Sequence, residues 1–457
     1  MTTPLLIAAP IVFIILLYVG RGYWAWVSAT TLLFAACFSS GVTFQNSHII
    51  AAAIAAGIAI VFGLPIIRRN LISGSVMRLI GRILPSMGET ERIALEAGTV
   101  WWDGDLFSGN PDWKKLLDFK LQPLSAEEQA FLDGPVEEFC RRLDDWQLAQ
   151  DRDLPEELWD FLRRKLFFGM VIPKEYGGLG FSAIGHSSVV TKISSRSVAA
   201  AVTVMVPNSL GPGELILHYG TEEQKQFYLP RLASGEEFPC FALTEPEAGS
   251  DAAATLSTGI VCKGTYEGEE VIGMRLNWRK RYISLAPVAT VVGLAFKLYD
   301  PDGLLGGETD LGITCALIPR GLPGVRIGDH HDPMGVPFNN GPIFGDDVFA
   351  PIDFIIGGQN GAGQGWRMLM ESLAAGRSVS LPSLSVGAAE LAARVTGAYG
   401  TVRKQFNMQI GRFEGVEERL TRIAGLTYLM NAARKLTCAA VDAGEKPSVL
   451  SAVLKAY

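Results

Sequence analysis

The sequence predicts an α+β fold in which helices, strands and helices follow one another, preceded by hydrophobic helices at the N-terminus. Three observations predict it. Residues 4–67 are almost free of charge, helical patterns dominate residues 125–238, and short apolar runs between Gly, Asp and Pro replace them after Pro239. A helical pattern then restarts at Trp366 and continues, with interruptions, to Tyr457. Strands that are grouped between helices, and do not alternate with them, indicate α+β.

The first 70 residues are expected to form a membrane segment. Three apolar runs, Leu5–Val19, Trp24–Phe38 and Ile49–Ile67, surround a single formal charge at Arg21. The third run has the length of about 20 residues that a helix needs to cross a bilayer, and the first two are somewhat short. A cleaved signal peptide is disfavoured, because no Lys or Arg precedes the first run. A buried core helix stays open as the alternative.

Positive charge follows the third apolar run, at Arg68, Arg69, Arg78 and Arg82. Cytoplasmic flanks of membrane helices gather Lys and Arg, so we expect a protein of the inner (cytoplasmic) membrane with its catalytic domain in the cytoplasm. Two or three crossings are both compatible with the runs. Residues 71–124 have no clear period and are expected to form a linker on the membrane or on the main body.

Residues 125–238 are expected to form a helical domain. Capping boxes, in which a Ser or Thr is followed three residues later by Glu or Gln, begin helices at Ser125 and Thr221. The second of these helices is expected to end at Leu229-Pro230, since Pro interrupts helices. Further helical patterns cover residues 137–148, 156–168 and 187–205.

Residues 239–360 are expected to form a small sheet or barrel, and residues 361–457 the start of a C-terminal helical domain. The apolar runs that predict strands are 241–243, 271–274, 288–294 and 313–318. Pro382 lies inside the helical pattern, so a kink or break is expected there. The glycine-rich Gly361–Gly365 does not predict a dinucleotide site, because Trp366 stands where the last glycine of that motif belongs.

Charge and cysteine content exclude two classes of function. The net charge is −7, so the chain has no overall basic field and nucleic acid is not expected as a partner. The six cysteines are scattered without a CxxC pair, and the five histidines are dispersed. A zinc site needs ligands at close spacing, so no metal is expected.

Four segments in sequence order resemble the acyl-CoA dehydrogenase family: PKEYGGLGF at 173–181, HYGTEEQKQFYLPRLASGE at 218–236, FALTEPEAGSD at 241–251 and MLMESLAAGR at 368–377. The N-terminal segment and NSLGPGELILHYG at 208–220 are similar to the bacterial membrane-associated long-chain members. The resemblance implies a helical N-terminal domain, a central β domain and a C-terminal helical bundle.

The stretch Thr244–Asp251 has the residue types that a flavin site needs. A loop at a strand end can offer backbone N–H groups and a Thr hydroxyl to the ring edge where negative charge develops. Pro246 stiffens the loop, and Gly249 lets the backbone approach closely. The resemblance implies that FAD is lined by the following residues: Phe241, Leu243, Thr244, Gly249 and Ser250. Ser250 would also meet the acyl-CoA.

Further roles follow from the resemblance alone. Tyr282 would stack on the flavin in place of the family's usual Trp, and the Ser284 hydroxyl would face flavin N5. Arg377 would lie near the substrate or orient the acidic base. Arg403 matches a residue that reaches the flavin pyrophosphate of a neighbouring subunit, which implies a homo-oligomer.

Proton abstraction from the carbon alpha to the thioester needs a carboxylate within hydrogen-bond reach. Most family members use a Glu late in the C-terminal bundle, and some use the position that Gly376 occupies here. Glu371 lies on another helical face from that position. We therefore assign no catalytic residue, expect the base beyond Tyr457, and expect the sequence to be a piece of a longer protein.

The resemblance implies an FAD-dependent enzyme that converts fatty acyl-CoA to trans-2-enoyl-CoA in β-oxidation and passes electrons to an electron-transfer flavoprotein. Two alternatives stay open. An acyl-CoA oxidase-like enzyme would share the fold and use oxygen. A catalytically inactive, membrane-anchored binding protein would keep the fold and lack the base.

Overall fold

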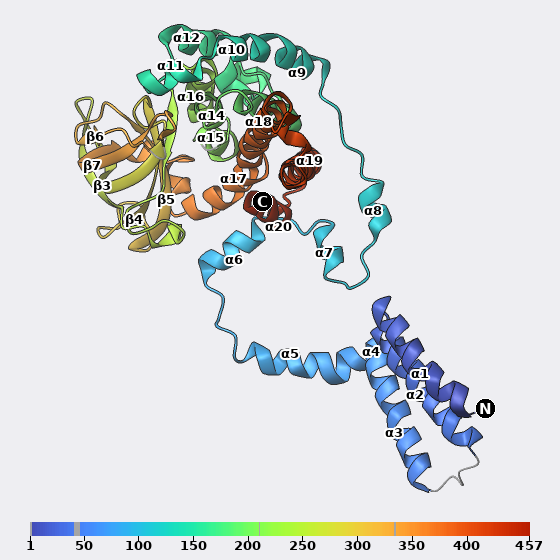
Figure 1. The fold of residues 1–457 in the computed structure, drawn as a ribbon. Coiled ribbons are helices and arrows are strands. Elements are labelled where there is room, and N and C mark those ends of the chain that lie inside the picture. The colour runs from blue at the N-terminus through green and yellow to red at the C-terminus, as the bar shows by residue number, and fades with distance from the viewer. Residues whose placement is uncertain (1, 41–45, 210, 333–334) are drawn as a thin grey trace. The chain divides into compact units, whose positions relative to one another are not determined.

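The computed structural model describes residues 2–40, 46–209, 211–332 and 335–457, apart from the side chains of residues 2, 65 and 373–377. The chain divides into two compact units, Met1–Met87 and Gly88–Tyr457. Each unit has an architecture of its own (Figure 1).

The first unit is made of helices: α1 Thr2–Tyr18, α2 Gly22–Ser39, α3 Asn46–Gly63, α4 Pro65–Arg68, the π turn Arg69–Ser73 and α5 Gly74–Gly81. The first two pack on each other, with the Phe13 and Trp26 ring centroids 5.0 Å apart. Among the described residues, α3 is the one helix with the length and composition to cross a membrane, and α1 is a shorter apolar helix. The third apolar run does not form one helix to Ile67 as expected, because α3 ends at Gly63 before Pro65.

Three short helices follow at the start of the second unit: α6 Glu89–Glu96, α7 Asp103–Leu106 and α8 Trp113–Leu117. The Trp366 Nε1–H donates to the Thr90 carbonyl (3.0 Å), and the Thr99 N–H donates to the Lys446 carbonyl (2.8 Å). These bonds place residues 90–99 against the C-terminal helices.

The N-terminal helical domain contains more breaks than the sequence indicates. Its helices are α9 Ala126–Phe131, a π turn Leu132–Val136, α10 Glu137–Arg142, α11 Asp145–Asp151, α12 Glu156–Arg164, α13 Ala183–Ser194, α14 Val198–Met205, α15 Gly213–Tyr219 and α16 Glu222–Ser234. The expected helix 137–148 is split because the Asp144 carboxylate caps α11, and 187–205 is split because the Ser197 hydroxyl caps α14.

Pro230 does not end α16, contrary to the expectation from sequence. The helix continues through Pro230 to Ser234 and ends at Gly235, which has a φ of 76°. A glycine in this left-handed conformation is a common helix end, since it has no Cβ to strain the backbone. The helix stop signal was therefore the glycine and not the proline.

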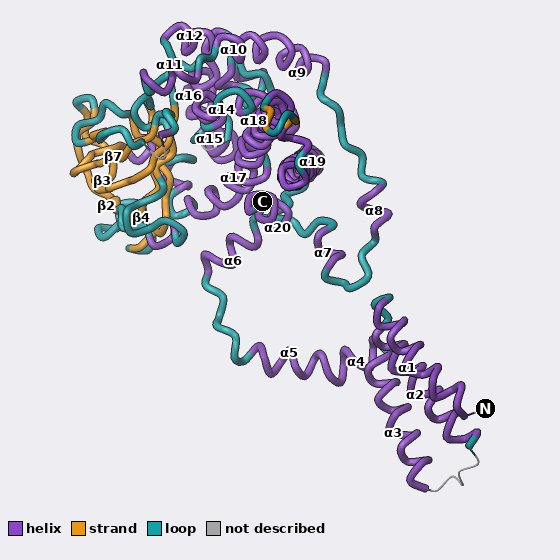
Figure 2. Tube along the Cα trace, viewed as in Figure 1, coloured by secondary structure: helices purple, strands orange, loops and turns teal. Residues whose placement is uncertain are grey.

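The middle domain is a curled seven-stranded sheet, and among the described residues the other named strands form one small hairpin (Figure 2). Its strands are β1 Pro239–Ala242, β2 Thr258–Tyr266, β3 Glu269–Ser284, β4 Val291–Tyr299, β5 Asp310–Pro319, β6 Val325–Ile327 and β7 Asn340–Pro351. All four expected strand regions are confirmed, whereas β2, β6 and β7 were missed. The hairpin is β8 Lys404–Gln405 with β9 Met408–Gln409.

Strand β4 determines how the sheet curls. Along one edge it pairs in parallel with two strands, β1 at residues 291–294 and β2 at residues 297–299. Along the other edge it pairs with β5 over its whole length. The order then continues from β2 through β3 and β7 to β6 by antiparallel pairs. One cluster of buried side chains, including Phe139, Phe167, Trp278 and Phe296, joins this sheet to the helical domain.

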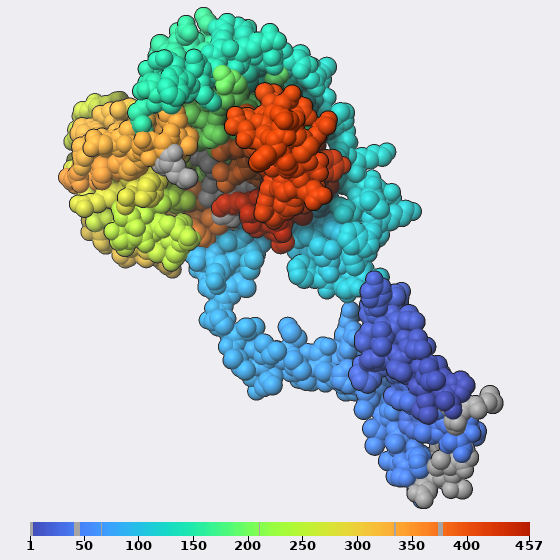
Figure 3. All heavy atoms as spheres, viewed as in Figure 1, coloured from blue at the N-terminus to red at the C-terminus, as the bar shows by residue number. Residues whose placement is uncertain are grey.

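The C-terminal helices are α17 Gly365–Ser378, α18 Ser380–Val402, α19 Glu414–Asp442 and α20 Ser448–Ala456. The break expected near Pro382 is confirmed, because α17 and α18 are separate helices that meet at Val379. Pro382 lies in the first turn of α18. Backbone N–H groups in a first turn make no bond within the helix, so the missing N–H of proline costs none. Figure 3 shows the red C-terminal helices lying against the green and teal N-terminal helical domain.

The shortest helical elements of the second unit are 3₁₀ turns at Phe167–Gly169, Lys174–Tyr176, Ala252–Ala254, Ile352–Phe354, Gly358–Gly361 and Ile410–Arg412.

Both expected capping boxes are confirmed, and both have a second role. The Ser125 hydroxyl accepts from the Glu128 N–H (3.2 Å), and Glu128 accepts in return from the Ser125 N–H (2.8 Å). Glu128 also accepts from the N–H and hydroxyl of Ser182, the residue that caps α13. Gln224 in the second box donates to the carbonyls of Asp353 and Ile355. Each box residue therefore ties its helix to a distant part of the chain.

The Glu128→Ala variant is expected to lose about 2–4 kcal/mol of unfolding free energy, because Ser125 and Ser182 lose the buried, charged acceptor that Glu128 provides. Chemical denaturation of the purified chain in detergent, followed by tryptophan fluorescence, measures this. Glu127→Ala is the matched control, since its ion pair with Lys174 is exposed and should contribute under about 1 kcal/mol. Equal losses in the two variants would contradict the structural role of Glu128.

Candidate functional site

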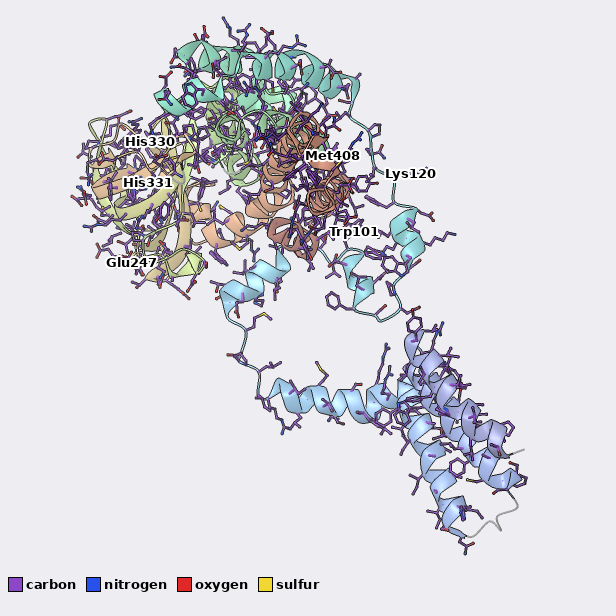
Figure 4. The ribbon with its side chains drawn as sticks, viewed as in Figure 1. Trp101, Lys120, Glu247, His330, His331 and Met408 are labelled. Carbon is purple, nitrogen blue, oxygen red and sulfur yellow. The ribbon has the colours of Figure 1, made fainter. Side chains whose placement is uncertain are left out.

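The loop Thr244–Asp251 begins one residue after the end of β1, with Leu243 between them, and turns sharply. The Glu245 N–H donates to the Ala248 carbonyl (3.0 Å), which closes the turn around Pro246 and Glu247. Ala248 is buried, whereas Gly249 and Ser250 are exposed. The loop therefore has a buried base and an exposed edge. Figure 4 shows Glu247 at the surface of the β domain.

A buried ion pair lies beneath this loop. Glu245 is 4% exposed and Lys280 1% exposed, and the Lys280 Nζ lies 2.8 Å from Glu245 Oε1. The same Nζ donates to the Leu243 carbonyl (2.9 Å). Glu245 further accepts from the hydroxyls of Thr255 and Ser257 and from the Leu256 N–H (2.7 Å). The loop is thus connected to β3 and to the segment that leads into β2.

The electrostatics of this pair favour the charged carboxylate. Burial alone would raise the pKa of Glu245, but the hydrogen bonds from Lys280, Ser257 and Thr255 lower it to about 2. Burial lowers the pKa of Lys280, and Glu245 opposes that shift. A buried charge is tolerated only where partners replace its hydration, and the hydrogen bonds above supply them.

Strand β3 carries a β-bulge beside the loop. Lys280 pairs with Ile343 and Ile283 with Gly341, so Arg281 and Tyr282 lie opposite Pro342 alone. Pro342 has no N–H to donate, so the broken ladder leaves no donor of that residue unpaired. The Arg281 N–H donates instead to the Thr244 carbonyl (2.9 Å), which joins the bulge to the loop.

The bulge presents Tyr282 to solvent. Its φ is 60°, a conformation uncommon for a residue other than glycine, and the residue is 54% exposed. The Arg281 guanidinium lies 4.6 Å from the ring centroid, and the His331 ring centroid lies 5.2 Å away. Figure 4 labels His331 and His330 on the β domain. An exposed aromatic ring in a strained backbone indicates a functional position.

The other residues expected at the flavin lie on the strands around this point. Phe241 is on β1, packed over Gly293 of β4, where an added Cβ would lie 2.6 Å from its ring. Leu243 provides the carbonyl bound by Lys280. Ser284 is half-buried at the end of β3, opposite Asn340. A Cβ on Gly249 would meet no protein atom within 4 Å, so the protein itself imposes no close approach there.

Two expected site residues belong to a different part of the fold. Arg403 is exposed and ends α18, where its carbonyl accepts from the Ile410 N–H (2.9 Å) across the small hairpin. Met408 of that hairpin appears in Figure 4 on the helical side, away from Glu247. Arg377 is the penultimate residue of α17, and its side chain lies outside the described ones.

Two neighbouring cavities, of about 480 and about 220 Å³, lie between the helical domains and share Glu214 and His218. Glu371 lines the larger one, where the Tyr219 hydroxyl donates to it (2.7 Å) and the Lys446 Nζ lies 3.5 Å away. The Glu214 carboxyl has no hydrogen bond or ion pair within the part of the chain that the structure describes. Burial raises the pKa of Glu214 to about 7.

Sequence reasoning missed the residues that hold this site in place. Lys280 had a usable signal, because Leu276, Trp278 and Lys280 occupy alternate, inward-facing positions of one strand. A lysine on an inward face requires a buried partner of opposite charge. Glu245, in the loop Thr244–Asp251, was the candidate. Glu214 gave no such signal, since its cavity is formed by helices far apart in the sequence.

Three family models match the chain: the acyl-CoA dehydrogenase N-terminal domain over residues 125–236, the middle domain over residues 240–348 and the C-terminal domain over residues 363–457. The chain belongs to the acyl-CoA dehydrogenase family, a family of oxidoreductases. The expected fold class is thereby confirmed, with a helical, a sheet and a second helical domain in that order.

The chain is also similar to individual proteins and to solved structures. The chain is 31% identical over 320 residues to the 3-(aryl)acrylate reductase of Clostridium sporogenes, covering 68% of this chain and 78% of that one. It is 60% identical over 104 residues to Protein HemX of Proteus mirabilis, covering 23% of this chain and 61% of that one. The acyl-CoA dehydrogenase of Bacillus anthracis, solved with FAD, has the same fold at 24% identity and a TM-score of 0.61, covering 73% of this chain and 55% of that one. The chain thus spans little more than half of two of these proteins.

The Lys280→Met variant is expected to lose about 3–5 kcal/mol of unfolding free energy, because Glu245 would stay buried without its cation. Thermal unfolding of the purified chain in detergent measures the loss. Lys263→Met is the matched control, since the ion pair of Lys263 with Glu270 is exposed. A Lys280→Met variant as stable as this control would contradict the role of the buried pair.

The Glu214→Gln variant is expected to gain stability relative to the native chain as pH rises. The unfolded carboxyl ionises near its ordinary pKa of 4.5, whereas the folded one ionises near 7, so the native chain loses stability between these values. The gain should reach about 1–3 kcal/mol above pH 7 and vanish near pH 4.5. Unfolding midpoints at a series of pH values test this, with the exposed Glu269→Gln as control. A difference that does not depend on pH would contradict the burial of a neutral Glu214.

Proposed function

We propose that this protein catalyses the FAD-dependent α,β-dehydrogenation of fatty acyl-CoA to trans-2-enoyl-CoA in β-oxidation, with electrons passing to an electron-transfer flavoprotein. Membership of the acyl-CoA dehydrogenase family supports the reaction class. The single observation that carries the proposal is the exposed edge of the Thr244–Asp251 loop, held beside the exposed Tyr282 by the buried Glu245–Lys280 pair.

FAD, when bound, supplies the acceptor for the hydride that leaves the beta carbon of the substrate. In the proposal, Thr244 and the backbone of its loop donate to the flavin ring edge, and Tyr282 packs against the ring. Ser284 offers its hydroxyl from the end of β3, and Ser250 meets both the cofactor and the acyl-CoA. Phe241, Leu243 and Gly249 line the same pocket. The carboxylate that removes the alpha proton lies outside this set.

Two positively charged residues extend the proposal. Arg377 is proposed to contact the acyl-CoA. Arg403 is proposed to reach the flavin pyrophosphate of a neighbouring subunit, so that the active protein is a homo-oligomer. The exposure of Arg403 at the end of α18 supports this role, because a group that serves a second subunit has to be accessible on the first.

We also propose that the protein resides at the inner (cytoplasmic) membrane with Gly88–Tyr457 in the cytoplasm. The apolar helix α3, none of whose residues is buried, supports a membrane location. The arginines that follow it, at positions 68, 69, 78 and 82, support a cytoplasmic location of the next residues.

The protein expressed from its full reading frame is expected to carry FAD and to change its flavin absorbance when palmitoyl-CoA is added, with trans-2-enoyl-CoA formed in the presence of an artificial electron acceptor. Tyr282→Ala should weaken FAD binding about tenfold through loss of ring stacking. Tyr428→Ala, which removes an exposed ring of α19, should leave it unchanged. A purified protein without flavin would contradict the proposal, and peroxide formation during turnover would favour an oxidase.

A further inference from the structure

The segment that follows α3 is amphipathic. Helix α4, the π turn and α5 form a continuous helical stretch from Pro65 to Gly81. At 100° per residue, Val76, Ile80 and Ile83 lie along one side of α5 and its extension, whereas Ser75, Arg78 and Arg82 lie along the other. A helix with two such faces matches a boundary between an apolar and a charged medium.

The apolar side of this segment is not covered within the first unit. Val76 is 46% exposed, Ile80 43% and Ile83 78%, and Leu79 and Leu84 are more than 60% exposed. A soluble helix of this pattern would pack its apolar face on a core. Here the face has no partner among the described residues of Met1–Met87.

The first unit, which contains this segment, is positively charged, whereas the whole chain is negatively charged. Residues 1–87 contain five arginines and no lysine, aspartate or glutamate, although the chain has a net charge of −7. None of these arginines forms an ion pair with a described residue, and Arg78 bonds only to its own helix, at Gly74 and Ser75. An unneutralised row of arginines beside an apolar face is complementary to an anionic surface over an apolar interior.

We propose that Pro65–Leu84 lies in the plane of the bilayer surface, with its apolar side among the acyl chains and its arginines bound to anionic phospholipid headgroups. The inference rests on the proposed membrane location, because α3 ends two residues before α4 and would deliver the segment to the interface. The occupant of the apolar face is therefore lipid, and the arginines select its charge.

Hydrogen exchange of the full chain in lipid nanodiscs tests this. Amides of residues 74–84 are expected to exchange at least about tenfold more slowly in discs of phosphatidylcholine mixed with phosphatidylglycerol than in phosphatidylcholine alone. Helix α12, with its buried core residues, serves as the internal reference that should not change.

Two double variants test whether the arginines of the segment cause the dependence on anionic lipid. Arg78→Gln with Arg82→Gln should abolish the dependence on anionic lipid. Arg92→Gln with Arg419→Gln removes two exposed arginines of the second unit and should preserve it. A chain that enters the discs but exchanges equally in both lipids would overturn this inference and leave the membrane location intact. A chain that does not enter the discs would overturn both.

Discussion

The buried pair of Glu245 and Lys280 is the interaction on which the geometry of the site depends. Two charges far from water are stable only if their remaining hydrogen-bonding capacity is used, which requires partners from several segments. Here the partners come from the end of β1, the approach to β2 and the middle of β3. The pair therefore holds three segments in one arrangement, and it connects the exposed loop after β1 to the rest of the sheet.

The helical domains were predictable where the signal is local. The capping boxes at Ser125 and Thr221 mark helix starts through contacts between residues three positions apart, and both are present. Breaks inside a helical pattern were harder to predict, because Asp144 and Ser197 are equally compatible with the middle of a helix and with a helix cap. Their tertiary surroundings decide between the two. The strands β2 and β7 were missed because glycines stand at buried positions, at Gly259 in β2 and at Gly341 and Gly345 in β7, so apolar side chains do not mark the inward face.

The site shows the same limit more sharply. The resemblance assigned Thr244, Ser250 and Tyr282 to a flavin site, and that assignment stays a prediction. The structure joins their segments through the bond between Arg281 and Thr244. The resemblance could not reveal which contacts hold those positions, because Glu245 and Lys280 are 35 residues apart and meet only in the folded sheet. Assignments that depend on another subunit, such as that of Arg403, or on side chains outside the described ones, such as that of Arg377, stay predictions.

The bulge in β3 shows which part of the strand serves the sheet and which serves the site. Inward-facing residues occupy even positions from Met274 to Lys280, and the next buried position is the odd one at Ile283. The strand could therefore lose one residue at Arg281–Tyr282 and still direct every core side chain inward. The extra residue serves the loop after β1, because the Arg281 N–H donates to the Thr244 carbonyl there. A sequence with a deletion at this point would keep the sheet and lose the bond by which β3 holds the loop Thr244–Asp251.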